Sequence, residues 1–193
     1  MRLGPVTRMC AVLFVLIAGG VRSRAQTAVS WNGGSGNWNT ASDWSGGVVP
    51  NNGGGNTYNV TISNNNPNVT LNLGVTISDL TLGSSATLQS AANDSLTIAS
   101  GGSLINNGTI SFSTSGSNLT LASGSTLTNN GTLDLLSSGE ALSVTGTTTN
   151  AGSMLIQGGG TATFTGARRC LGNAPPCFGG CQKLPGKPSR KGF

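Results

Sequence analysis

Residues 95–117 read SLTIASGGSLINNGTISFSTSGS, residues 118–140 read NLTLASGSTLTNNGTLDLLSSGE, and residues 141–156 read ALSVTGTTTNAGSMLI. Written under one another, these segments keep their apolar residues in the same columns, and their Asn-x-Gly tripeptides start at a nearly constant interval, at Asn106, Asn129 and Asn150. A fixed period of this length is typical of repeat proteins in which each unit stacks on the next. The chain is therefore expected to form a stack of similar units.

Within each unit, apolar residues alternate with Thr, Ser or Asp, as Leu96 and Ile98 do around Thr97. A period of two places successive side chains on opposite faces of a β-strand, and Ser-Gly, Asn-Gly and Gly-Gly clusters keep the strands short. No stretch between residues 26 and 167 carries a helical period. Because such a unit cannot bury its apolar face alone, we predict an all-β, right-handed parallel β-solenoid, or β-helix.

The Asn-x-Gly tripeptides are interpreted as corners of the coil. Asn and Gly tolerate the left-handed backbone conformation of a sharp turn, and amides stacked in successive coils can hydrogen-bond as a ladder. At this period, the stretch 57–166 is long enough for about five coils. The period is less regular upstream, where the unit that starts at Leu80 precedes Leu96 by less than one full repeat. The alternative is an antiparallel β-sandwich, but that fold does not explain why equivalent apolar residues recur at a fixed interval along the sequence.

The distribution of charge excludes several classes of function. All ten Lys and Arg residues lie in the first 24 or the last 26 positions, and the stretch from residue 26 to residue 167 has a net charge of −5. Nucleic-acid binding by this body is not expected, because phosphate neutralisation needs basic side chains. The chain has no His, which excludes an imidazole base and a His-ligated metal. We predict no cofactor and no metal.

Residues 1–25 read MRLGPVTRMCAVLFVLIAGGVRSRA and have the features of a secretory signal peptide. Arg2 and Arg8 form a positive n-region, an apolar h-region follows, and small residues precede a cleavage point before Gln26. The apolar run is too short for the ~20 residues of a membrane-spanning helix, so an anchor is the weaker alternative. We expect a secreted protein, extracellular or at the cell surface, with no stable transmembrane segment after cleavage.

The last segment, residues 167–193, differs abruptly in composition from the repeat. It carries six basic residues, several Pro residues, which cannot donate to a sheet ladder, and three Cys residues. The cysteines Cys170, Cys177 and Cys181 are odd in number and their spacing matches no metal-site pattern. We expect this segment to be a disordered tail that does not continue the solenoid, as after a shifted reading frame or a broken gene end.

Residues 31–50 read WNGGSGNWNTASDWSGGVVP and lead into YNVTI at residues 58–62. This segment resembles the opening of secreted bacterial β-helix proteins with autotransporter-associated β-strand repeats, in which a Trp-rich lead precedes Asn-, Thr- and Gly-rich repeats. The resemblance covers residues 26–166 and implies an exported surface or extracellular β-helix. Such proteins are usually much longer, so the chain resembles a truncated member.

The chain's three tryptophans, Trp31, Trp38 and Trp44, lie close together in the sequence, all before the regular repeats. Exposed Trp rings could stack on sugars and form a carbohydrate-binding site. Alternatively, large rings could close the open end of the first coil, since the terminal units of a solenoid must cap its core. We favour an N-terminal cap over residues 26–56 and keep carbohydrate binding as the alternative.

Asp94 and Glu140 form the best candidate acid pair. They lie two periods apart, each two positions before the leading Leu of its coil, with Ser117 in the coil between them. Two rungs would separate them by about 10 Å, at the edge of the ~6.5–9.5 Å range of an inverting glycosidase. We expect both side chains at a solvated turn surface, which favours turn residues without a catalytic role.

These observations predict a non-catalytic exported β-solenoid that acts as a structural or adhesive surface element. Its expected partners are surface glycans or other extracellular polymers. The alternative is a β-helix protein that binds or degrades polysaccharides, through the Trp cluster or through Asp94 and Glu140.

Overall fold

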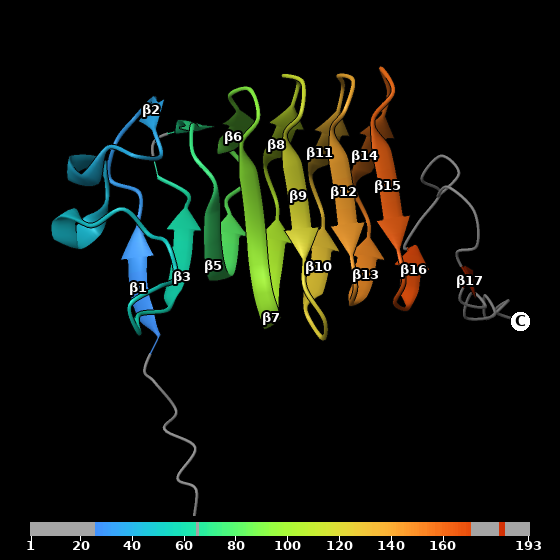
Figure 1. The fold of residues 1–193 in the computed structure, drawn as a ribbon, viewed down its shortest axis with the longest axis horizontal. Coiled ribbons are helices and arrows are strands. Elements are labelled where there is room, and N and C mark those ends of the chain that lie inside the picture. The colour runs from blue at the N-terminus through green and yellow to red at the C-terminus, as the bar shows by residue number, and fades with distance from the viewer. Residues whose placement is uncertain (1–25, 65, 171–181, 184–193) are drawn as a thin grey trace, which may run out of the picture.

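The computed structural model describes residues 26–64, 66–170 and 182–183, which form a parallel β-solenoid of about five turns. Every pairing between its named strands is parallel, and the described residues contain no α-helix. The coils stack along one axis from β1 at one end to β16 at the other (Figure 1). The predicted all-β parallel solenoid is therefore confirmed, in place of an antiparallel sandwich.

Each coil runs over three faces, and the first face is a continuous sheet along the whole solenoid. Strands β5 and β7 turn a corner, so only residues 79–82 and 103–106 of these strands lie on this face. The strands of the first face are β1 (Thr27–Ser30), β3 (Tyr58–Ile62), β5 (Val75–Leu82), β7 (Ser95–Asn106), β10 (Thr126–Asn129), β13 (Thr147–Asn150), β16 (Arg168–Cys170) and β17 (Gln182–Lys183).

The second face is a separate six-stranded sheet, which the chain reaches after each corner that follows the first face. Its strands are β2 (Gly36–Asn37), β4 (Asn68–Leu71), β6 (Thr87–Ser90), β8 (Thr109–Phe112), β11 (Thr132–Leu135) and β14 (Ser153–Ile156). The third face begins with residues 75–77 of β5 and 95–98 of β7. It continues with β9 (Asn118–Leu121), β12 (Ala141–Val144) and β15 (Thr161–Phe164).

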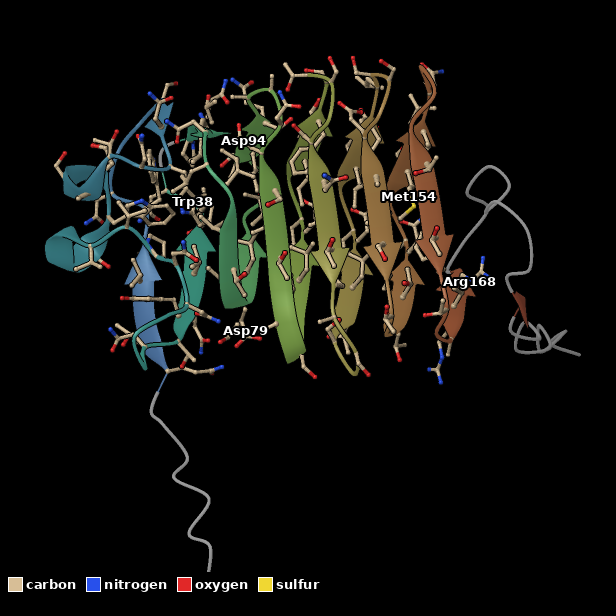
Figure 2. The ribbon with its side chains drawn as sticks, in the orientation of Figure 1. Trp38, Asp79, Asp94, Met154 and Arg168 are labelled. Atoms are coloured by element: carbon tan, nitrogen blue, oxygen red, sulfur yellow. The ribbon has the colours of Figure 1, made fainter. Side chains whose placement is uncertain are left out.

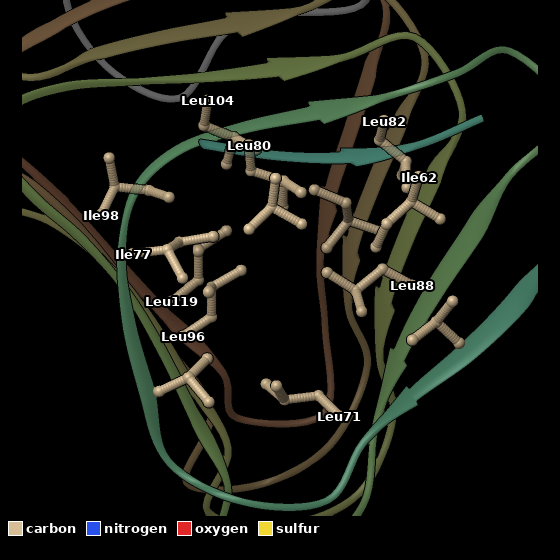
Figure 3. Packing of buried hydrophobic residues seen from close by; sticks show 14 of the residues in the cluster. Ile62, Leu71, Ile77, Leu80, Leu82, Leu88, Leu96, Ile98, Leu104 and Leu119 are labelled. Atoms are coloured by element: carbon tan, nitrogen blue, oxygen red, sulfur yellow. The ribbon is translucent and has the colours of Figure 1, made fainter. Parts of the chain in front are cut away.

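The core fills the inside of the coil, because alternate side chains of the strands on all three faces point inward, and Figure 3 shows part of this packing. Leu96 pairs with Leu119, which pairs with Leu142, and Ile98, Leu121 and Val144 form a second column. All of these are at most 1% exposed. Each such side chain contributes ~1.5–3 kcal/mol by leaving water. The predicted columns are confirmed over these three coils.

The upstream register differs from the sequence expectation. Leu80 pairs with Leu104, and the partner of Leu96 is Val75. Leu80 and Leu96 therefore lie on two different faces, and the short interval between them is not a shortened repeat. The misassignment arose because β5 and β7 carry two faces without a sequence break, with a register shift only between Ile77 and Asp79.

The Asn-x-Gly corners form two amide ladders, as the stacked tripeptides predicted. On the inside, the Nδ2 atoms of Asn106 and Asn129 donate to the Oδ1 atoms of Asn129 and Asn150, each over 2.7 Å. On the outside, the Nδ2 of Asn130 donates to the Oδ1 of Asn107 over 2.9 Å. Gly is required at the corner itself, since a Cβ on Gly131 would collide with the carbonyl oxygen of Gly108.

The backbone strand pairing of the first face continues beyond residue 166, where the solenoid was expected to end. Arg168–Cys170 (β16) pairs with β13, and Gln182–Lys183 (β17) pairs with β16. Parallel pairing uses backbone groups only, so a basic segment can add a rung although its side chains break the apolar pattern. The rest of the tail, including Cys177 and Cys181, lies outside the described residues, and so do residues 1–25, for which a signal peptide was predicted.

Candidate functional site

Three tryptophan rings form the core of the solenoid at its β1 end. Trp31 follows β1, Trp38 follows β2, and Trp44 lies between two short 3-10 turns, Ala41–Asp43 and Ser45–Gly47. The ring of Trp44 packs edge-on against both others, with centroid distances of 4.8 Å to Trp31 and to Trp38. Such T-shaped pairs are favourable because the positive ring edge meets the negative ring face.

Each indole N–H of this cluster donates to a backbone carbonyl. Trp44 donates to Trp38 over 2.8 Å, Trp31 to Gly34 over 2.9 Å, and Trp38 to Pro50 over 3.2 Å. The rings are at most 1% exposed, and Trp38 lies within the solenoid at its β1 end (Figure 2). No ring face is available to a sugar in this arrangement, so carbohydrate stacking on these tryptophans would require the cluster to open.

Asp94 and Glu140 lie in one column at a corner of the coil, with Ser117 on the rung between them. The backbone N–H of Asn118 donates to the carbonyl of Asp94, and that of Ala141 donates to the carbonyl of Ser117. The sequence thus predicted their alignment correctly. It was wrong about their exposure, since Asp94 is only 8% and Glu140 only 1% exposed.

The burial of Glu140 has a local cause. Its side chain folds back over its own turn, where Oε2 accepts a hydrogen bond from the backbone N–H of Ser137 over 2.9 Å. Its Oε1 is buried without a hydrogen-bond partner among the described residues. On the intervening rung, the hydroxyl of Ser117 donates to the carbonyl of Ala91 over 2.7 Å. Burial raises the pKa of Asp94.

The geometry of this corner gives little support for a catalytic role. One carboxylate oxygen of Glu140 is already bound by the turn, and the hydroxyl of Ser117 is directed at a backbone carbonyl. Within the described ranges, no three His, Cys, Asp or Glu side chains gather where they could hold a metal ion. The column therefore offers two separate buried carboxylates and no described third group that acts with them.

A regular polar surface covers the third face, and the search for single reactive residues overlooked it. Thr76, Thr97, Thr120, Ser143 and Thr163 pair in register on successive rungs, with side chains outward. We call these five residues the hydroxyl column. The signal was present in the sequence, because each member directly follows a core residue of the repeat.

The neighbouring outward column of the third face is also free of charge. It consists of Ser95, Asn118, Ala141 and Thr161. Adjacent strands of a sheet lie about 4.8 Å apart, so the hydroxyl column presents hydrogen-bonding groups at a constant spacing along the solenoid axis, while Ala141 interrupts the second column. A surface of this kind can contact a regular, uncharged polymer at many weak points.

No helix in the part of the chain that the structure describes has the length and hydrophobicity needed to cross a membrane. Comparisons of the chain with models of protein families, with curated proteins and with solved structures gave no significant match.

Proposed function

We propose that this chain is an exported, non-catalytic β-solenoid that acts as a structural or adhesive element at the cell surface or in the extracellular space. The observation that supports the proposal best is the hydroxyl column on a charge-free third face. A stack of paired strands with a continuous core resists bending, and its outward Thr and Ser groups favour contact with neutral extracellular polymers such as glycans. Individually weak contacts on one rigid surface add up when several engage together.

A binding assay with the purified chain and insoluble neutral polysaccharides tests the adhesive role. We expect binding that a single Thr120→Glu substitution weakens, because it places a charge in the middle of the hydroxyl column. Thr128→Glu on β10 is the matched control, since Thr128 points outward on the first face. Equal binding by both variants and the parent would remove the third face from the proposal.

The same experiment distinguishes the alternative functions. Release of soluble sugar that disappears in Glu140→Gln would contradict a non-catalytic role and favour a polysaccharide-degrading enzyme. Glycan binding that is lost in Trp38→Ala, while the parallel β-sheet signal in circular dichroism is retained, would move the binding site to the Trp cluster. Binding to no polymer would leave only the structural role.

A further inference from the structure

Four Asn-Gly dipeptides occur in the chain, and one of them differs from the other three in its hydrogen bonds. They start at Asn32, Asn52, Asn107 and Asn130. Asn followed by Gly is the sequence most prone to spontaneous deamidation, because Gly leaves the next backbone nitrogen unobstructed. The reaction needs that nitrogen and the Asn side-chain amide to be free at the same time.

Three of the four dipeptides have both groups engaged. At Asn52, the side chain accepts from Tyr58 N–H over 2.8 Å and donates to the hydroxyl of Ser78 over 3.3 Å, while Gly53 N–H donates to Asn56 over 3.1 Å. A local opening of the structure must therefore precede deamidation at this position.

The other two engaged dipeptides belong to the stacked corners. The side chains of Asn107 and Asn130 bind each other over 2.9 Å. Gly108 N–H donates to the Oδ1 of Asn106 over 3.2 Å, and Gly131 N–H donates to the carbonyl of Asn106 over 3.1 Å. The amide ladders that join the coils thus also occupy the groups that deamidation requires.

The fourth dipeptide, Asn32–Gly33, has neither group engaged. Asn32 is exposed, and within the described residues neither its side-chain amide nor the Gly33 N–H has a hydrogen-bond partner. The Asn32 backbone N–H donates to the carbonyl of Asp43 over 2.7 Å. We propose that Asn32 is a modification site of this protein, which converts spontaneously to aspartate or isoaspartate while the three other Asn-Gly pairs are protected.

The conversion proceeds in two balanced steps. The Gly33 nitrogen loses its proton and attacks the side-chain carbonyl carbon of Asn32, so that a C–N bond forms and the amide nitrogen leaves as ammonia. Water then adds to either carbonyl of the resulting succinimide, and one C–N bond breaks to give aspartate or isoaspartate. The net change is the loss of ammonia and the gain of water, with no other reactant.

The product places a new negative charge beside the Trp cluster. A Cβ on Gly33 would lie 3.2 Å from Cγ of Asp43 and 3.2 Å from Cε2 of Trp31, so this loop packs directly on both side chains. A carboxylate at position 32 is expected to repel that of Asp43, and an isoaspartate adds a backbone atom to the loop. Age-dependent loosening of the β1 end would follow.

Mass spectrometry of chymotryptic peptides after incubation at mildly alkaline pH tests the proposal. Cleavage after Trp31 and Trp38 isolates residues 32–38, while trypsin has no site between residues 26 and 167. In denaturant, all four Asn-Gly pairs should deamidate at similar rates. In the folded protein, Asn32 should react nearly as fast as in denaturant, and the other three more than about tenfold slower, because local opening limits them.

Asn32→Gln is the matched variant, since Gln closes the corresponding ring far more slowly. It should remove the modification from the peptide 32–38 and leave the other peptides unchanged. The proposal is overturned if Asn32 in the folded protein reacts as slowly as Asn52, Asn107 and Asn130. It is equally overturned if all four react as fast in the folded protein as in denaturant.

Discussion

The two ends of the solenoid bury their core to very different extents. At the β1 end, the Trp cluster closes the core, and none of its rings is more than 1% exposed. At the other end, the inward side chains are only partly buried, although their partners one coil earlier are at most 1% exposed. These end residues are Met154, Ile156, Ala162 and Phe164, and their partners are Leu133, Leu135, Leu142 and Val144.

On the first face, a single inward column changes from apolar to polar residues toward this end. Val60, Leu80, Leu104 and Leu127 follow one another in this column, and the next members are Thr148 and Arg168.

At the end of this column, the guanidinium of Arg168 lies over the Phe164 ring, 5.4 Å from its centroid. A cation on an aromatic face covers the ring without burying the charge. In a stack of coils, each coil covers the apolar side chains of its neighbour. Special residues are therefore needed only at an end of the stack, where no next coil covers the core.

The first prediction, which has the largest expected effect, concerns the continuous apolar core between the two ends. Leu121→Asp should unfold the chain, because it places an unpaired charge between Ile98 and Val144, at a cost on the order of 5 kcal/mol. Circular dichroism and urea titration measure the loss. The adjacent Thr120→Asp points outward and should change the free energy of unfolding by less than about 0.5 kcal/mol. Similar damage from both variants would contradict a half-buried strand.

The second prediction compares the ends directly. Trp38→Ala should lower the free energy of unfolding by about 3–5 kcal/mol, because it empties a fully buried site and removes an edge-on partner of Trp44. Phe164→Ala at the other end should cost less, about 1–2 kcal/mol, since this ring is only partly buried against the core. Urea unfolding of both variants gives the difference. Equal losses would mean that the described ends are equally closed.

Sequence reasoning succeeded where one side chain per coil carries the information. The Leu96, Leu119 and Leu142 column and the Asn106, Asn129 and Asn150 ladder could be found from spacing alone, because a parallel stack repeats each contact at each rung. The closely spaced tryptophans likewise indicated a special terminal unit.

It failed where backbone geometry decides the outcome. Charge alone indicated a solvated Glu140, but the turn at Ser137 draws the carboxylate inward. The composition of the tail indicated an end at residue 166, but strand pairing needs no particular side chains, and Arg168–Cys170 adds a rung. Neither a turn amide nor a free strand edge leaves a pattern in the sequence.

The third prediction uses two carboxyl groups with limited access to water, one from each half of the solenoid: Asp94, which is buried, and Asp134, which is half-buried. Burial raises the pKa of Asp94 and of Asp134, and Oδ1 of Asp134 has no hydrogen-bond partner among the described residues. A folded-state pKa above the unfolded value means that protonation stabilises the fold. This contribution is fully present below the ordinary Asp pKa of about 4 and is lost as the pH rises through the folded-state pKa.

Urea titrations from mildly acidic to neutral pH measure this effect. The parent should lose stability across that interval, and Asp94→Asn and Asp134→Asn should each make the loss smaller. If only Asp134→Asn does so, the burial penalty is confined to the half of the solenoid away from the Trp cluster. Unchanged pH dependence in both variants would contradict the raised pKa values.

The smallest effect on stability is expected at the outer edge of β14. This strand reads Ser-Met-Leu-Ile, and within the described residues it pairs only with β11, so its other edge is unpaired among those residues. Leu155 points outward, is 37% exposed and pairs with Asp134. Exposed apolar edge strands promote association between molecules, and natural proteins guard them with Lys.

Leu155→Lys should therefore slow concentration-dependent aggregation, followed by light scattering, while the free energy of unfolding changes by less than about 0.5 kcal/mol. The new ammonium lies across from the Asp134 carboxylate, and an opposite-charge pair at this position is favourable by roughly 0.2–1 kcal/mol. Thr128→Lys adds the same charge on β10, which is paired on both sides. If Thr128→Lys slows aggregation equally, net charge is the cause and the free edge of β14 is not.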